Sequence, residues 1–186
     1  CDDGSTAEAR RFLEQTAEQD SRLRLIRPGN CIALAPRLNA CLKEARGQFL
    51  ARMDDDDYSC RERFSRQLLF LKEHPEVSFV GSNAVLWRGG KSVGVRIFPE
   101  SPEVRDFFFT QPYLHPSLMF RREALLAVGG YEEDSRCILC EDYDLLLRLY
   151  ATGRRGMNLQ ENLLFYTVSD TVKGNRKMCH RWNESV

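Results

Sequence analysis

The chain contains 186 residues, of which 42% are hydrophobic, and this size and composition suit one folded domain with a substantial core and exclude a disordered chain. Lysine plus arginine and aspartate plus glutamate each number 27, so the formal net charge is zero and the basic excess typical of a nucleic-acid-binding protein is missing. No stretch of the sequence reaches the roughly 18 apolar residues that a membrane span needs.

The seven cysteines are odd in number and irregularly spaced. This pattern favours reduced thiols in a cytoplasmic protein over a disulfide framework. Cys137 and Cys140 form a single CxxC motif without a second pair, so the support for a zinc or redox site is weak.

Capping boxes and apolar spacing predict alternating helices and strands in the first half of the chain. The chain opens as if a strand were turning into a helix, with the strand itself missing before Cys1. The predicted elements are a helix from the Ser5–Glu8 capping box to about Gln19, a strand at 23–26, a helix at 32–45, a strand at 49–53, a helix from the Ser59–Glu62 capping box to His74, and a strand at 77–81.

The second half of the chain is predicted to begin with a hairpin around Gly89 and Gly90. A strongly amphipathic helix and a final strand come near its end, and the last 17 residues are polar. The predicted elements are a hairpin at 83–98, a short helix at 102–109, a strand at 117–120, a helix at 122–128 that Gly129 and Gly130 stop, a helix at 141–151 and a strand at 158–168.

This order of elements predicts an α/β domain with a mixed sheet that is parallel in its first part and flanked by helices. Ligands of such sheets bind at the C-terminal ends of the strands. The Asp2–Asp3 turn and the aspartate run at 54–57 both follow predicted strand ends. We therefore expect these two acidic turns to share one crevice.

The four consecutive aspartates at 54–57 directly follow the apolar strand predicted at 49–53. Mg²⁺ and Mn²⁺ prefer carboxylate oxygens, and four clustered negative charges repel one another unless a cation holds them together. Arginines on both sides of the run would suit an anionic ligand such as a diphosphate. The alternative is a solvated acidic loop.

A third acidic cluster, Glu141–Asp144, opens the late amphipathic helix. Acidic side chains are stabilised at a helix N-terminus by free N–H groups and the macrodipole, so a purely structural role is one interpretation. The functional interpretation makes one of these carboxylates a general base that points into the crevice.

Five segments with suitable spacing occur in order along the chain: Asp2–Thr6, Ala51–Asp57, His115–Arg121, Val128–Tyr131 and Glu141–Leu145. Together they closely resemble the family 2 glycosyltransferases, which are bacterial inverting enzymes with a GT-A fold. The likeness extends from Asp2 to about Phe165 and implies a GT-A domain at 1–169, without the family's first strand and helix, followed by a polar tail at 170–186.

The resemblance implies a donor site for a nucleotide-sugar, expected to be UDP-linked. Asp3 would accept hydrogen bonds from the base. Asp54 and Asp56 would form the DxD pair, with Asp56 on the metal, Mg²⁺ or Mn²⁺, and Asp54 on the metal or the ribose.

On the acceptor side, the resemblance makes Asp142 the catalytic base that deprotonates an acceptor hydroxyl. Glu141 would orient the acceptor or the helix, and His115 would line the acceptor side of the pocket. The alternative for His115 is a hydrogen-bonded core residue.

The implied function is transfer of one sugar to a hydroxyl acceptor, such as a lipid-linked saccharide of a surface polysaccharide, at the cytoplasmic face of the membrane with peripheral association. Residues Tyr166–Ser169 depart from the family because they lack the arginine and histidine that often follow the last strand. Two alternatives stay open. One is an inactive GT-A fragment with a structural or interaction role, and the other is a different Mg²⁺-dependent nucleotidyl or phosphoryl transferase.

Overall fold

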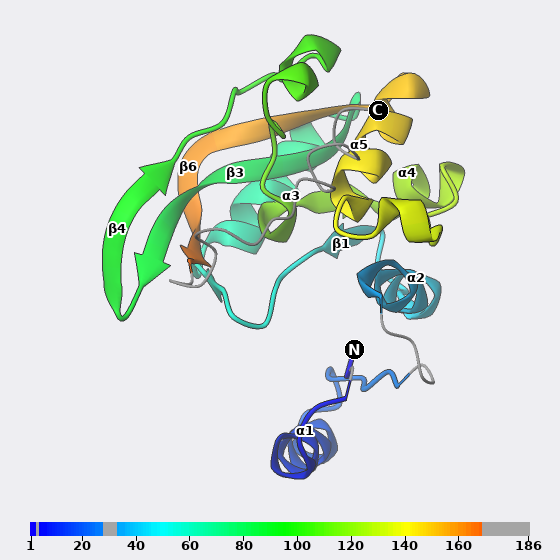
Figure 1. Ribbon diagram of the computed structural model, residues 1–186, viewed down its shortest axis with the longest axis vertical. Coiled ribbons are helices and arrows are strands. Elements are labelled where there is room, and N and C mark those ends of the chain that lie inside the picture. Colours follow the sequence, from blue (N-terminus) through cyan, green and yellow to red (C-terminus); the bar gives the residue numbers. More distant parts are fainter. Residues whose placement is uncertain (3, 28–32, 169–186) are drawn as a thin grey trace.

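The computed structural model describes residues 1–2, 4–27 and 33–168, which form a curved mixed sheet with helices on both faces and a helix, α1, that lies apart from the sheet (Figure 1). The helices are α1 (Ala7–Gln19), α2 (Leu34–Glu44), α3 (Arg63–Glu73), α4 (Arg122–Ala127) and α5 (Glu141–Ala151), with short 3₁₀ helices η1 (Val104–Phe108), η2 (His115–Ser117) and η3 (Ser135–Cys137). The strands are β1 (Phe49–Ala51), β2 (Tyr58–Ser59), β3 (Val77–Arg88), β4 (Lys91–Arg96), β5 (Met119–Arg121) and β6 (Arg155–Thr167).

The sheet has the strand order β1-β5-β3-β6-β2, and β4 pairs with β3 outside that path. The long strands β3 and β6 are parallel, whereas the other pairs are antiparallel. Since β1 and β3 are both antiparallel to β5, these two early strands run in the same direction although β5 separates them. The predicted α/β class with a mixed, helix-flanked sheet is confirmed.

Alternating side chains of the central strands form two cores, one on each face of the sheet. On one face, Phe79 and Phe120 pack with the α5 residues Leu145, Leu146 and Leu149. On the other face, the neighbouring residues of the same strands pack against α3. That second core contains Leu71, Val77, Val80 and Met119. The apolar stripe of α5 therefore holds the N-terminus of this helix against the sheet.

Three local predictions were wrong. The side chain that caps α1 is Thr6, which accepts a hydrogen bond from the Ala9 N–H, whereas Ser5 gives its own N–H to Asp2. Ser59 does not cap α3, because it lies in β2 and pairs with Leu164 of β6. Residues 23–26 form no strand, because their only backbone bond to another segment in the described part of the chain is Asp2 N–H to Ile26 O.

The helix α1 buries none of its residues, and Phe12 on it is 67% exposed. Within the described ranges, no helix is both long and apolar enough to cross a membrane. The polar tail predicted at 170–186 lies outside the described residues.

Candidate active site

A pocket of about 460 Å³ opens between the aspartate loop, the segment that contains η1 and η2, and the N-terminus of α5. It brings together four predicted site residues from three distant parts of the sequence. These are Asp54, His115, Glu141 and Asp142.

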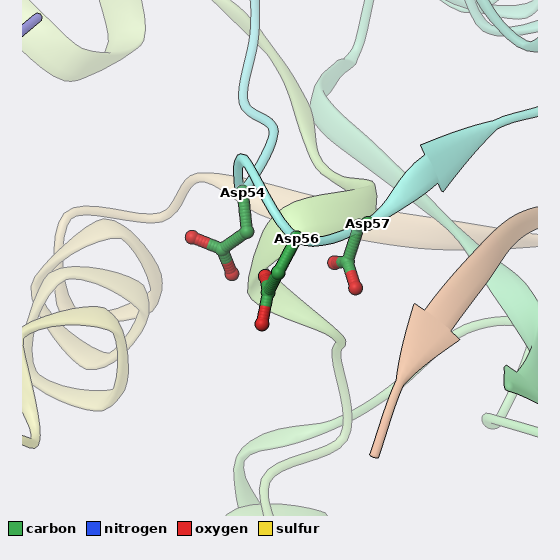
Figure 2. Close-up of side chains that lie close together, drawn as sticks. All are labelled: Asp54, Asp56 and Asp57. Atoms are coloured by element: carbon green, nitrogen blue, oxygen red, sulfur yellow. The ribbon is translucent and has the colours of Figure 1, made fainter. Parts of the chain in front are cut away.

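The aspartate loop connects β1 to β2 at one side of this pocket. Carboxylate oxygens of Asp54, Asp56 and Asp57 lie within 4.8 Å of one another, and Figure 2 shows the three side chains on the same side of the loop. Asp55 is exposed and does not belong to this group. Of the four aspartates, three therefore form a cluster with the spacing of a metal site.

Asp57 is the buried member of the cluster, with 6% of its surface exposed. Its Oδ1 accepts a 2.8 Å hydrogen bond from the Thr167 N–H, whereas its Oδ2 is buried without a hydrogen-bond partner. Burial raises the pKa of Asp57 to about 6 against the opposing effect of the Thr167 bond, and the charges of Asp56 and Asp54 raise it further. A divalent cation bound here would give the buried oxygen a partner and would also reduce the repulsion among the three carboxylates.

Arg52 and Arg96 bring positive charge to the pocket wall. The Arg52 side chain is only 9% exposed and forms an ion pair with Asp54. Neither arginine was assigned a role from the sequence, because Arg52 fell within the strand predicted at 49–53, whereas it lies just after β1, and Arg96 fell within a hairpin whose curvature could not be foreseen. Both are placed to attract an anionic ligand.

Asp142 lies in the first turn of α5 and lines the same pocket as Asp54 of the aspartate loop. Its Oδ2 accepts a 2.7 Å hydrogen bond from Gln111 Nε2, and its Oδ1 accepts a 2.8 Å bond from the Tyr143 N–H. These two bonds fix the orientation of the carboxylate. Gln111 had not been singled out, since nothing in its local sequence indicates this contact.

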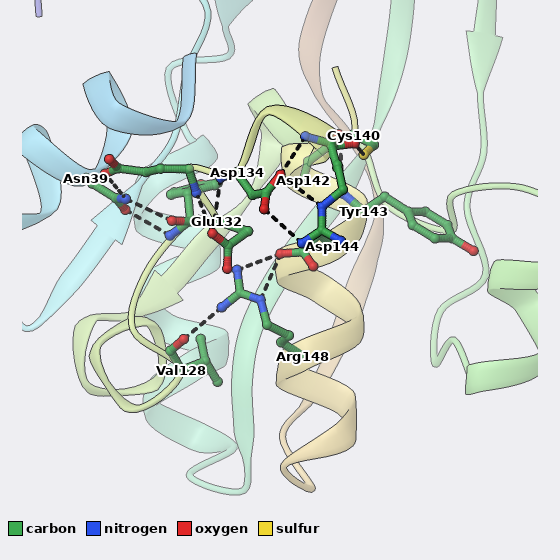
Figure 3. A network of polar contacts seen from close by, with 12 residues as sticks. Asn39, Val128, Glu132, Asp134, Cys140, Asp142, Tyr143, Asp144 and Arg148 are labelled. Atoms are coloured by element: carbon green, nitrogen blue, oxygen red, sulfur yellow. Dashed lines mark hydrogen bonds and ion pairs between the residues drawn. The ribbon is translucent and has the colours of Figure 1, made fainter. Parts of the chain in front are cut away.

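The remaining acidic residues of the α5 terminus have different surroundings. Glu141 lines the pocket and is only 6% exposed. Asp144 instead pairs with Arg148 one turn later, and Arg148 Nη1 also donates to the Val128 carbonyl over 2.7 Å (Figure 3). Asp144 therefore has a structural role.

His115 both lines the pocket and forms part of the buried hydrogen-bond network. Its Nε2 lies 2.8 Å from the Tyr131 hydroxyl. Burial, with the nearby charge of Arg52, lowers the pKa of His115 well below its usual value, so the imidazole is neutral at physiological pH. His115 is thus a hydrogen-bonded buried residue that also lines the pocket, and its place on the acceptor side stays a prediction.

The Gly129-Gly130-Tyr131 turn positions this tyrosine through Asn39 of α2. Asn39 Oδ1 accepts from the Tyr131 N–H and Asn39 Nδ2 donates to the Tyr131 carbonyl, both over 2.8 Å. Gly130 has φ +78°, and a Cβ on it would come within 2.5 Å of Asn39 Oδ1. The glycine is therefore required both by its backbone conformation and by the close approach of α2.

The cysteines Cys137 and Cys140 are free thiols in the structure. Burial raises the pKa of Cys140 to about 12, which is the opposite of the activation that a redox or metal-binding cysteine needs. Among the described residues, the aspartate cluster is the one group of three or more His, Cys, Asp or Glu side chains that lie close enough together to hold a metal ion.

Comparison with known protein families shows to which family the chain belongs. The sequence profile described as "Glycosyl transferase family 2" matches residues 1–128. The chain belongs to glycosyltransferase family 2.

Individual members of this family agree with the assignment. The chain is 37% identical over 164 residues to the candidate glycosyltransferase EpsE of Bacillus subtilis (strain 168), covering 88% of this chain and 59% of EpsE. It is 33% identical over 177 residues to WfaP of Escherichia coli, a UDP-Glc:alpha-D-GlcNAc-diphosphoundecaprenol beta-1,3-glucosyltransferase, covering 95% of this chain and 67% of WfaP. The chain thus spans somewhat more than half the length of EpsE.

Solved structures confirm the GT-A fold of the family. TarS 1–349 of S. aureus in complex with UDP-GlcNAc superposes with a TM-score of 0.68 at 22% identity, over 91% of this chain and 48% of the TarS 1–349 chain. The mannosyltransferase PcManGT of Pyrobaculum calidifontis, in complex with GDP-Man and Mn²⁺, gives 0.66 at 18% identity, over 92% of this chain and 47% of PcManGT.

The first acidic turn of the predicted site is only partly described by the structure. Asp3 lies outside the described residues. The Asp2 carboxylate is buried, accepts from the Ser5 N–H over 3.1 Å and lies within 3.6 Å of Arg10 and 3.4 Å of Arg27. These contacts support a structural role for Asp2, and the crevice shared with the aspartate loop stays a prediction.

Proposed function

We propose that this chain is the donor-binding and catalytic part of an inverting glycosyltransferase that moves one sugar from a UDP-sugar to a hydroxyl acceptor. The observation that carries the proposal is the pocket itself, whose lining includes both Asp54 of the carboxylate cluster and the oriented Asp142 carboxylate. The cluster suits a metal-bound nucleoside diphosphate, and Asp142 suits a hydroxyl that must lose its proton.

The donor half of the site consists of the aspartate loop and the pocket arginines. Asp54, Asp56 and Asp57 would hold Mg²⁺ or Mn²⁺; Asp56 is exposed to solvent, and Asp54 also pairs with Arg52. When bound, the metal would neutralise charge on the donor diphosphate. Asp3 is the proposed partner of the uracil. The complexes of the two structural neighbours, one with UDP-GlcNAc and one with GDP-Man and Mn²⁺, support a nucleotide-sugar and a divalent metal.

The acceptor half of the site performs the proton transfer. Asp142 accepts the proton of the acceptor hydroxyl while the acceptor oxygen bonds to the anomeric carbon of the sugar. The bond from that carbon to the diphosphate oxygen breaks, and the nucleoside diphosphate leaves with the bonding electrons. This single displacement inverts the anomeric configuration. Gln111 keeps Asp142 oriented, and Glu141 and His115 complete the wall on which the acceptor would lie.

The acceptor class is inferred from the relatives. WfaP is named for an acceptor that carries a saccharide on diphosphoundecaprenol, and this supports a lipid-linked saccharide of a surface polysaccharide as the acceptor here. Such an acceptor would place the enzyme in the cytoplasm, at the inner face of the membrane.

Product analysis tests this function without knowledge of the acceptor. Incubation of the chain with Mn²⁺ and a panel of UDP-sugars should release UDP and free sugar slowly, as water replaces the acceptor. Release of UMP or pyrophosphate would instead identify a phosphoryl or nucleotidyl transferase. A folded chain that binds UDP but releases nothing from any UDP-sugar, even with saccharide acceptors present, would contradict a catalytic role.

A further inference from the structure

Two fully buried polar side chains, Arg63 and Gln67, lie one turn apart on α3 behind the aspartate loop. Both are 0% exposed, and Arg63 Nε donates to Gln67 Oε1 over 3.1 Å. Burying a guanidinium is costly unless its hydrogen bonds and charge are compensated. An apolar residue at either position would be buried without this desolvation cost. Packing alone therefore does not explain the pair.

Arg63 holds the residue that leads into the aspartates. Its Nη2 donates to the Arg52 carbonyl over 2.7 Å, and the Arg52 N–H donates to the Leu118 carbonyl over 2.9 Å. Both backbone polar groups of Arg52 are therefore fixed, while its side chain forms the ion pair with Asp54. The start of the loop has little freedom as long as Arg63 is present.

Gln67 extends this connection to the other wall of the pocket. Its Nε2 donates to the carbonyls of Val80, over 3.1 Å, and Ser117, over 2.7 Å. Ser117 ends η2, the short helix that begins with His115. The pair thus joins the aspartate loop, the central strand β3 and the His115 segment through side chains that no solvent reaches.

The charge of Arg63 also acts on the carboxylate cluster. Its Nη1 is buried without a hydrogen-bond partner, as is Oδ2 of Asp57. Burial and the charge of Arg52 lower the pKa of Arg63 to about 10, while Asp57 opposes this shift, so the guanidinium stays charged at neutral pH. A positive charge behind three crowded carboxylates reduces their mutual repulsion and keeps the loop in one conformation.

We propose that Arg63 and Gln67 are positioning residues that set the geometry of the aspartate cluster relative to the His115 wall. Neither reaches the pocket surface, so both act through the residues they hold. This proposal rests on the proposed function, because it assumes that the cluster binds a divalent cation and a nucleoside diphosphate.

The test measures Mn²⁺ binding, through the increase in Tm that Mn²⁺ produces, and Mn²⁺-dependent binding of UDP by calorimetry. Arg63→Met and Gln67→Met should each weaken Mn²⁺ affinity by about tenfold to a hundredfold, the usual effect of removing a residue that orients metal ligands. Arg63→Lys keeps the charge but not the planar fork, so its affinity should lie between those of Arg63→Met and the wild type. Leu71→Ala, a core truncation on the same helix, is the control: it should lower Tm without changing the Mn²⁺ affinity of the folded chain.

The outcomes separate this proposal from the function on which it rests. If the wild type binds Mn²⁺ and UDP, and folded Gln67→Met binds them equally well, the positioning proposal is wrong and the function stands. If Arg63→Met does not fold, Gln67→Met decides alone. If the wild type binds neither Mn²⁺ nor UDP, both proposals fail. Equal losses of affinity in Leu71→Ala and Gln67→Met would show that general stability, and not positioning, controls the site.

Discussion

Thr167, the last residue of β6, donates its backbone N–H to Oδ1 of Asp57 over 2.8 Å, and its hydroxyl donates to the Asp56 carbonyl. The final strand of the sheet thereby holds the aspartate loop, which is more than 100 residues away in the sequence. The bond from the Thr167 N–H satisfies Oδ1 of Asp57, whereas Oδ2 is buried without a hydrogen-bond partner. The stability of the folded chain should therefore depend on the protonation of Asp57 and on a metal bound beside it.

Asp57→Asn should stabilise the metal-free chain at pH 7. The folded pKa of Asp57, about 6, is above its ordinary value of 3.8, so the folded state binds the proton more tightly and wild-type stability falls as pH rises between these values. The gain should be about 1–2 kcal/mol, less than the full shift implies because solvent reaches the neighbouring exposed carboxylates.

Urea unfolding in EDTA at pH 4 and pH 7 measures this effect. The advantage of Asp57→Asn should disappear near pH 4, and saturating Mn²⁺ should stabilise the wild type more than the variant. A variant that is less stable than the wild type at pH 7 in EDTA, with the same pH dependence, would contradict this assignment.

Asp142→Asn should reduce sugar transfer by about a hundredfold to ten-thousandfold, the usual contribution of a general base, while Mn²⁺-dependent UDP binding stays unchanged. Asp144→Asn is the matched control on the same helix turn, because Asp144 pairs with Arg148. It should cost at most about 1 kcal/mol of stability and leave kcat unaffected. Initial rates for the two variants side by side decide the point, and equal losses of kcat would mean that the base lies elsewhere.

Gln111→Leu should lower kcat by roughly tenfold without changing the KM for the donor. The substitution keeps the size of the side chain but removes the 2.7 Å bond that orients Asp142 Oδ2. Steady-state kinetics with varied UDP-sugar would show the split. A rise in donor KM at constant kcat would instead place Gln111 on the donor side.

Gly130→Ala should destabilise the chain by more than Gly129→Ala does. Both glycines have φ +78°, so each alanine introduces about 1–2 kcal/mol of backbone strain. A Cβ on Gly130 also collides with Asn39 Oδ1 at 2.5 Å, whereas a Cβ on Gly129 meets nothing within 4 Å. Thermal unfolding of the two variants checks this difference. Equal Tm values would show that Asn39 and α2 can move away from the new Cβ without loss of stability.

Long amphipathic elements and the strongest turn signals were predictable from the sequence. The helix at Glu141–Ala151 was predicted with its exact bounds, because Leu145, Leu146 and Leu149 are spaced for one buried face and Gly153 follows. The hairpin around Gly89 and Gly90 was also predicted, because a Gly-Gly pair favours the tight turn of a hairpin, and both glycines have the positive φ that such a turn needs.

Elements that depend on distant partners were not predictable. Ser59 follows the local rule for a helix cap, yet pairing with Leu164 places it in a strand. The same limit applies to the site. Acidic motifs indicated Asp54 and Asp142, whereas Gln111 and Arg96 join the pocket only through tertiary contacts. The burial of Arg63 was not predicted either, because the sequence does not show that α3 turns this residue inward.

Calorimetric titration of UDP into the chain, with and without Mn²⁺, tests the central claim most directly. The wild type and Asp55→Asn, which alters the exposed aspartate outside the cluster, should bind UDP only when Mn²⁺ is present, and Asp56→Asn should lose this binding. A folded wild-type chain that binds neither UDP nor GDP in Mn²⁺, or that binds UDP equally well without the metal, would contradict the account.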